Sequence, residues 1–171
     1  MSVFRLIRSI QLADQYERYK KKKPSAADQK LTHCIRCGLC CHCGPPSLSK
    51  EDAKNIATSL ILHQDEFVQR YCIVNRLKGT PWTFYLARKS QLKHAGKVLP
   101  WEQTRVFDSP CCFYEEAKGC LLEKVKPTIC KKYVCWNPQE GQSPEALQIS
   151  EFSKEEIETL TGGVDWEEED E

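Results

Sequence analysis

The segment CIRCGLCCHCG, residues 34–44, contains five of the eleven cysteines in the chain. Cys34, Cys37 and Cys40 recur at every third position, and two intervening residues let successive sulfur atoms curl around one compact centre. Cys41 directly follows Cys40, and neighbouring side chains diverge in extended backbone. The adjacent pair therefore serves one centre only if the chain turns sharply there, and otherwise its two sulfurs serve different centres.

Disulfide bonds are a poor explanation for this cysteine content. A chain of 171 residues with four Trp, six Phe and six Tyr can bury a core without covalent staples. Eleven cysteines cannot all pair internally, because the number is odd. Arg5, Arg8 and Asp14 interrupt the N-terminal apolar residues, unlike a secretory signal, and no apolar run is long enough to span a membrane. We therefore expect a cytoplasmic protein whose thiols stay reduced and available as ligands.

Charge is distributed unevenly along a chain whose formal net charge is +1. The basic run Lys20–Lys23 stands before a proline without interleaved aromatic residues, which favours a solvated linker over a nucleic-acid site. The acidic end VDWEEEDE is typical of a solubilising tail. Binding to nucleic acid is therefore not expected, and the partner or client is expected to be a protein of unknown identity.

Apolar periodicity predicts helices at residues 3–19, 49–62 and 153–160, and one or two helical turns at residues 65–72. Ser49 is the expected N-cap of the second of these helices, with Asp52 completing a capping box. Residues rich in β-preferring side chains predict short strands at 80–89 and 106–109. These elements predict an α+β fold, a small, mainly helical domain with little strand, organised around a cysteine-rich metal centre.

The predicted elements and the cysteine-rich segments divide the chain into three parts. These are an N-terminal helical arm and linker, a cysteine-cluster domain, and a C-terminal short helix with an acidic tail, at residues 1–30, 31–138 and 139–171.

A second cysteine-rich segment, SPCCFYEEAKGCLLEKVKPTICKKYVC, lies far from the first in the sequence. It adds candidate ligands at Cys111, Cys120, Cys130 and Cys135, and the intervening loops are long enough to close onto the first segment. Thiolates are soft ligands that select zinc, copper(I) or iron–sulfur clusters. Cys72 stands alone after an amphipathic stretch and is interpreted as a small buried hydrophobic residue.

Together the two segments resemble the YkgJ-type cysteine-cluster family of zinc- or iron-chelating proteins, over about residues 34 to 135. The family's first motif, C-x-x-C-G-x-C-C, is matched completely, with Gly38 at its glycine. Its second motif is similar to the second segment, where it maps onto the positions Cys111, Phe113, Gly119, Cys120, Glu123, Pro127, Cys130, Tyr133 and Cys135. The resemblance implies that the metal or cofactor ligands are Cys34, Cys37, Cys40, Cys41, Cys111, Cys120, Cys130 and Cys135.

Some positions depart from the family pattern. Lys126 and Lys131 stand where the family has arginines, which keeps the charge but loses the planar guanidinium fork. Cys43 and Cys112 are additional to the matched cysteines, and we interpret them as neighbours of the ligands or as alternative ligands.

Two interpretations of function remain open. The first is a protein that holds a cysteine-ligated iron–sulfur cluster of the 4Fe-4S type, with a redox, electron-transfer or assembly role. Gly38 favours the iron–sulfur interpretation, because a glycine lets backbone amides approach the cluster sulfurs. The alternative is a binding or adaptor module closed by structural zinc without redox activity, favoured because the sequence shows no catalytic group.

Enzymatic activity has weaker support. The resemblance extends to the cluster-bearing part of flagellin lysine methylases, so a methylase-like activity stays open, but no glycine-rich fingerprint for a nucleotide or methyl donor is present. A metal-dependent hydrolase would need open coordination positions with nearby carboxylates. His33 and His42 flank the first cysteine segment and are possible further metal contacts.

Overall fold

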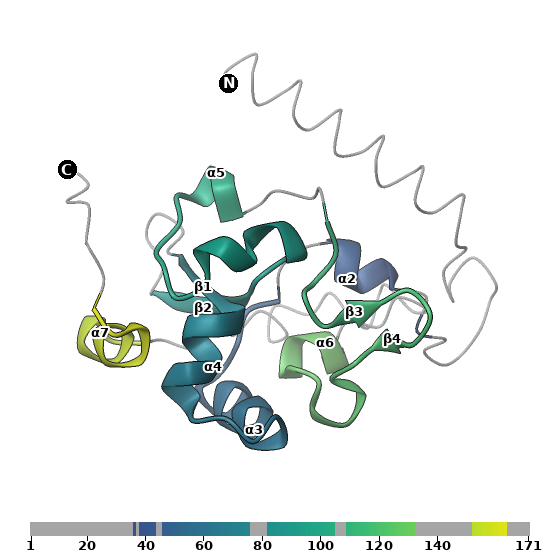
Figure 1. The fold of residues 1–171 in the computed structure, drawn as a ribbon, viewed down its shortest axis with the longest axis horizontal. Coiled ribbons are helices and arrows are strands. Elements are labelled where there is room, and N and C mark those ends of the chain that lie inside the picture. The colour runs from purple at the N-terminus through teal and green to yellow at the C-terminus, as the bar shows by residue number, and fades with distance from the viewer. Residues whose placement is uncertain are drawn as a thin grey trace, which may run out of the picture.

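The computed structural model describes residues 36, 38–43, 46–75, 82–104, 109–132 and 152–163. The described chain combines short helices with two small antiparallel sheets, which is a mixed α+β fold (Figure 1). The helices are α2 (Leu39–Cys43), α3 (Lys50–Ser59), α4 (Gln64–Tyr71), η1 (Lys89–His94), α5 (Trp101–Thr104), η2 (Glu123–Val125), α6 (Thr128–Lys132) and α7 (Lys154–Thr161). The strands are β1 (Cys72–Asn75), β2 (Thr83–Leu86), β3 (Tyr114–Glu115) and β4 (Gly119–Cys120).

Helix α3 begins as its sequence predicts. The Ser49 hydroxyl accepts a hydrogen bond from the Asp52 backbone N–H at 2.9 Å, and the Ser49 N–H donates to Asp52 Oδ2 at 3.1 Å. This capping box satisfies N–H groups that have no partner within the helix. The helix then buries Ala53, Ile56 and Ala57 against the core. The prediction for this element is confirmed.

The larger sheet pairs β1 with β2 in antiparallel register, from Cys72 opposite Leu86 to Asn75 opposite Thr83. The predicted strand at 80–89 contains β2 but extends too far, because Lys89 begins the 3₁₀ helix η1. The predicted helical turns at 65–72 correspond to α4, which ends at Tyr71. Strand β1 follows without a loop and was not predicted. Among the described residues the sheet content is small, as expected.

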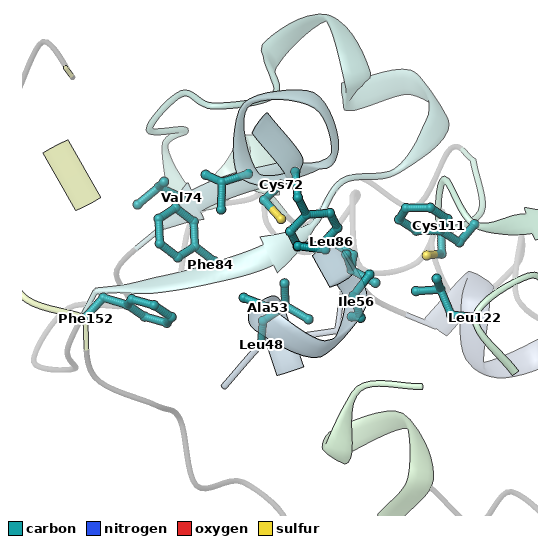
Figure 2. Packing of buried hydrophobic residues seen from close by; sticks show 14 of the residues in the cluster. Leu48, Ala53, Ile56, Cys72, Val74, Phe84, Leu86, Cys111, Leu122 and Phe152 are labelled. Atoms are coloured by element: carbon teal, nitrogen blue, oxygen red, sulfur yellow. The ribbon is translucent and has the colours of Figure 1, made fainter. Parts of the chain in front are cut away.

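One apolar core joins these elements (Figure 2). Phe67 and Val68 of α4 pack with both strands of the larger sheet, and Cys72 is fully buried among them, as predicted. Figure 2 shows Phe152 towards one end of this cluster and Cys111 with Leu122 at the other. The second cysteine-rich segment is therefore anchored in the core by its own apolar side chains.

Helix α7 confirms the helix predicted at 153–160, and it belongs to the same core. Its Ile157 is fully buried, and the Phe152 N–H donates to the Trp82 carbonyl oxygen at 3.2 Å. Gln69 Nε2 of α4 also donates to the Leu160 carbonyl oxygen at 3.3 Å. The C-terminal helix thus packs on the domain that carries the cysteines, and the predicted boundaries between the three parts stay a prediction.

The predicted helix at residues 3–19 lies outside the described residues. So does the strand predicted at 106–109, apart from Ser109, which is a bend. Among the helices that the structure describes, none is long and apolar enough to cross a membrane.

Candidate metal centre

The two cysteine-rich segments meet in the structure. The Cys111 backbone N–H donates to the Cys41 carbonyl oxygen at 2.9 Å, so the start of the second segment lies directly against α2. Figure 1 shows α2, the β3–β4 hairpin and α6 grouped at one side of the fold. These elements and their connections carry five of the predicted ligands, namely Cys40, Cys41, Cys111, Cys120 and Cys130. The other three, Cys34, Cys37 and Cys135, lie outside the described residues.

A short helix brings the adjacent cysteines of the first motif to one place. The Cys41 thiol lies near the sulfurs of both Cys40 and Cys120, and its interactions with these two sulfurs are the largest causes of the rise in its pKa. Neighbouring residues would diverge on an extended strand, but the turn of α2 at Leu39–Cys43 brings both sulfurs to the same cysteine of β4. This is the sharp turn that the sequence required if the pair serves one centre.

Thiolate character is concentrated at two of these three sulfurs. The hydrogen bond from Cys41 lowers the pKa of Cys40 to about 7 and that of Cys120 to about 6, although burial opposes both shifts. The positive charge of Lys126 lowers both values further. The pKa of Cys41 itself is raised, because its proton is shared with the neighbouring sulfurs. Since the thiolate is the metal-binding form, Cys40 and Cys120 are chemically prepared to bind a metal near neutral pH.

A second thiol pair lies beside this group. The Cys112 thiol hydrogen-bonds to Cys111 and lowers the pKa of Cys111, and the nearby charge of Arg88 lowers it further. The pKa of Cys112 is correspondingly raised, first by the hydrogen bond to Cys111 and then by burial. Of this pair, Cys111 is therefore the more acidic thiol, and it is the residue that the family motif matches.

Cys130 approaches the same region from α6. Burial raises its pKa most, and the negative charges of Cys40, Cys111 and Cys120 raise it further. The sulfur of Cys130 is therefore close enough to the other thiols to interact with them electrostatically. All seven cysteines whose side chains the structure describes are free thiols: Cys40, Cys41, Cys72, Cys111, Cys112, Cys120 and Cys130.

The donor set fits a thiophilic metal in its chemistry, because it offers free sulfurs, three of them with lowered pKa values, on converging segments. Within the described part of the chain, no three Cys, His, Asp or Glu side chains are grouped closely enough to hold a metal ion. A coordination sphere built from these residues therefore requires adjustment of their side chains or ligands from the remaining cysteines of the motifs.

The glycine of the first motif is required by a close contact. Gly38 has φ of +81°, a left-handed conformation that favours glycine, and a Cβ atom there would overlap the ring of Tyr114. Tyr114 is 4% exposed, and its ring packs edge-on against the His42 ring at 5.7 Å. Because Gly38 has no side chain, the first segment lies directly against Tyr114 of the second segment. The sequence did not reveal this role of the glycine.

Charged side chains surround the cysteines. Glu123 pairs with Arg36 at 2.8 Å and with Lys126 at 3.2 Å, which fixes Lys126 beside the thiols whose pKa values it lowers. His42 lies on α2, where its carbonyl oxygen accepts a hydrogen bond from Arg88. His33 lies outside the described residues.

Asp52 connects α3 to the helix that carries Cys130. Besides its role in the capping box, its Oδ1 atom accepts hydrogen bonds from the backbone N–H of Thr128 at 3.0 Å and from the Thr128 hydroxyl at 2.9 Å. One buried carboxylate therefore satisfies the first turns of both α3 and α6. The local sequence pattern predicts the first contact, but the second joins residues that are 76 positions apart and leaves no local signal.

We expect Asp52→Ala to destabilise the protein by about 2 to 3 kcal/mol and to weaken metal retention, because both helix starts lose their acceptor. Glu156→Ala is the matched control: Glu156 completes the capping box of α7 in the same way, but its second contact is an ion pair with Lys50 at 2.5 Å rather than a bond to α6. It should cost about 1 kcal/mol and leave metal content unchanged. Thermal unfolding and metal analysis check both variants, and equal metal loss in the two would contradict the connecting role of Asp52.

Comparison with known proteins supports metal binding by this chain. The family model CxxCxxCC, "Putative zinc- or iron-chelating domain", matches residues 33–156. The chain is also 30% identical over 100 residues to the uncharacterized protein MJ0661 of Methanocaldococcus jannaschii, a match covering 58% of this chain and 42% of that protein. The chain thus spans less than half the length of this relative, and no solved structure gave a significant match. Because the family model covers most of the chain, the protein belongs to this cysteine-cluster family of zinc- or iron-chelating domains.

Proposed function

We propose that the protein holds a cysteine-ligated iron–sulfur cluster, of the 4Fe-4S type, and that it acts in redox chemistry, electron transfer or cluster assembly. The observation that carries the proposal is the backbone hydrogen bond from the Cys111 N–H to the Cys41 carbonyl oxygen at 2.9 Å, which joins the first motif to the second. Cys130 lies within electrostatic range of Cys40 and Cys111. The eight motif cysteines, which we propose as the ligands, exceed the four that one 4Fe-4S cluster or one zinc ion needs, and they are enough for two centres.

The surroundings of the thiols suit a charged cofactor that is shielded from water on one side. When bound, an iron–sulfur cluster supplies a one-electron redox centre whose potential depends on net charge, hydrogen bonds to sulfur and exposure to solvent. Leu122 and Phe113 are buried beside Cys111 and exclude water from that side. Lys126 supplies positive charge near Cys40 and Cys120. These residues are placed to influence the potential and retention of a cluster.

Structural zinc is the second candidate, because the family description names zinc as well as iron. Four thiolates complete a tetrahedral zinc site, and such a site closes a fold without any redox role. Under this alternative the protein would be a binding or adaptor module, and the remaining motif cysteines would form a second site or stay unligated.

The deciding experiment is metal and sulfide analysis of protein purified without oxygen, together with visible and electron paramagnetic resonance spectra. We expect iron and acid-labile sulfide in equal amounts and a broad visible absorption that bleaches on reduction. A colourless protein with stoichiometric zinc and no labile sulfide would refute the iron–sulfur proposal and establish the zinc alternative.

Substitutions separate ligands from bystanders. Cys120→Ser should remove most of the bound metal, because a serine hydroxyl replaces a thiolate ligand poorly. Cys72→Ala is the control, since Cys72 is fully buried in the apolar core and Ala keeps that position apolar. This control should keep the parent's metal content despite some loss of stability. Metal content per folded protein is the measurement, and a Cys120→Ser variant with full metal would remove Cys120 from the ligand set.

A further inference from the structure

Arg88 is the largest side chain that is fully buried in the described part of the chain, with 0% exposure. Burial of a guanidinium group is costly unless its charge and its N–H groups are compensated. Neither composition nor motif spacing draws attention to this residue. Its position between the two cysteine-rich segments suggests that Arg88 holds them together.

The guanidinium group of Arg88 contacts both segments. Its Nη1 atom donates to the Ser109 carbonyl oxygen, and its Nη2 atom donates to the His42 carbonyl oxygen at 3.2 Å. His42 lies on α2 between the motif cysteines and Cys43, and Ser109 immediately precedes the Pro110–Cys111 step. A single side chain therefore fixes the distance between the helix that carries Cys40 and Cys41 and the chain that leads to Cys111.

The backbone around Arg88 reinforces this arrangement. Arg88 forms an antiparallel bridge with Cys111, the Cys112 N–H donates to the Ala87 carbonyl oxygen at 3.0 Å, and the Lys89 N–H donates to the Pro110 carbonyl oxygen at 3.0 Å. The Arg88 N–H is held by Gln91 Oε1 at 3.0 Å. The guanidinium group thus projects from a backbone that is paired on both sides of the residue, so its position is rigid.

The charge of Arg88 also lies beside the second cysteine-rich segment. Its backbone is bridged to Cys111, and its guanidinium group is held at the Ser109 carbonyl oxygen two residues before Cys111. Zinc or an iron–sulfur core bound by four thiolates keeps an excess of negative charge, and a buried site offers little solvent to offset it. A fully buried, permanently protonated guanidinium is suited to this task because it cannot lose its proton in proteins.

We propose that Arg88 is a positioning residue of the metal centre, which clamps α2 to the Ser109–Cys112 segment and offsets the negative charge of the bound metal–thiolate group. This inference rests on the proposed ligation by cysteines from both segments, whichever metal is bound. It adds a requirement for a buried positive charge, which is independent of the number of ligands.

The test compares Arg88→Lys with Arg88→Gln in the full-length chain. Zn²⁺ is the probe, and its affinity for metal-free protein is measured by competition with a chromophoric chelator. Arg88→Lys keeps the charge and should retain affinity within about threefold, whereas Arg88→Gln keeps a hydrogen-bond donor without charge and should lose about 10- to 100-fold. Rescue by Lys is the result that a purely structural role would not give.

Controls distinguish the possible failures. Arg70→Gln removes an exposed arginine that pairs with Glu66 on α4, and it should leave Zn²⁺ affinity unchanged. Equal losses in Arg88→Lys and Arg88→Gln would overturn the charge role, and unchanged affinity in Arg88→Gln would overturn the whole inference. If Arg88→Gln does not fold, as judged by circular dichroism, Arg88→Lys alone tests the charge role. A loss of Zn²⁺ affinity in Arg88→Lys of more than about threefold would then overturn it. A parent protein that binds no Zn²⁺ and is isolated without metal would instead refute the proposed function.

Discussion

Removal of the bound metal is expected to loosen helix α3 as well as the cysteine-rich segments themselves. The proposed ligands come from both ends of a span of about a hundred residues, and the described elements that carry some of them are tied to the core by specific contacts. Asp52 joins α3 to α6, and the Cys111 N–H joins the core to α2. Metal binding in small modules contributes on the order of 10 kcal/mol, comparable to the total stability of a domain. Loss of the metal should therefore destabilise the fold as a whole.

Hydrogen exchange followed by mass spectrometry measures this effect. Amides of Ile56 and Ala57 in α3 should exchange at least tenfold faster after treatment with a chelator, and treatment with the same chelator already saturated with zinc is the control. Protection in α3 that does not change, while the cysteine-rich segments lose theirs, would show that the metal centre is peripheral to the fold.

Replacement of Gly38 by Ala is expected to destabilise the protein by about 4 kcal/mol and to remove most of its metal. Two costs add: a left-handed backbone costs an L-residue about 1 to 2 kcal/mol, and overpacking against a buried ring costs about 1 to 3 kcal/mol. The Tyr114 ring cannot move away freely, because it is buried and packs against His42. The new methyl group would therefore push α2 away from the β3–β4 hairpin and separate Cys41 from Cys120.

Gly162 provides a closely matched control for this substitution. Its φ of +80° is nearly the same as that of Gly38, but a Cβ atom there would meet only the Gln69 side chain at 3.4 Å, an ordinary contact. Gly162→Ala should cost about 1 to 2 kcal/mol and leave metal binding intact. Chemical denaturation and metal analysis of both variants check the prediction. Equal destabilisation in the two variants would mean that backbone conformation, and not contact with Tyr114, explains the glycine.

Sequence alone was most informative where the signal is local. The capping box of Ser49 and Asp52 lies within four residues, and the structure has it as predicted. Helix α7 is similar, since Ser153 and Glu156 form the same motif. Strand β1 was missed because Cys72 continues an amphipathic stretch, and only pairing with Leu86 on a distant strand makes it extended. Strand formation depends on such partners, which no local window contains.

The cysteines themselves show the same division. Their number and spacing determined by themselves that the chain has the ligands for a thiophilic metal, because the chemistry of a thiolate depends on the residue and not on the fold. Only the tertiary structure decided that Cys41 meets Cys120, that Tyr114 fills the space left by Gly38, and that Arg88 is buried between the segments. These contacts join residues that are distant in the sequence, and their formation depends on how the whole core packs, which no short pattern of residues encodes.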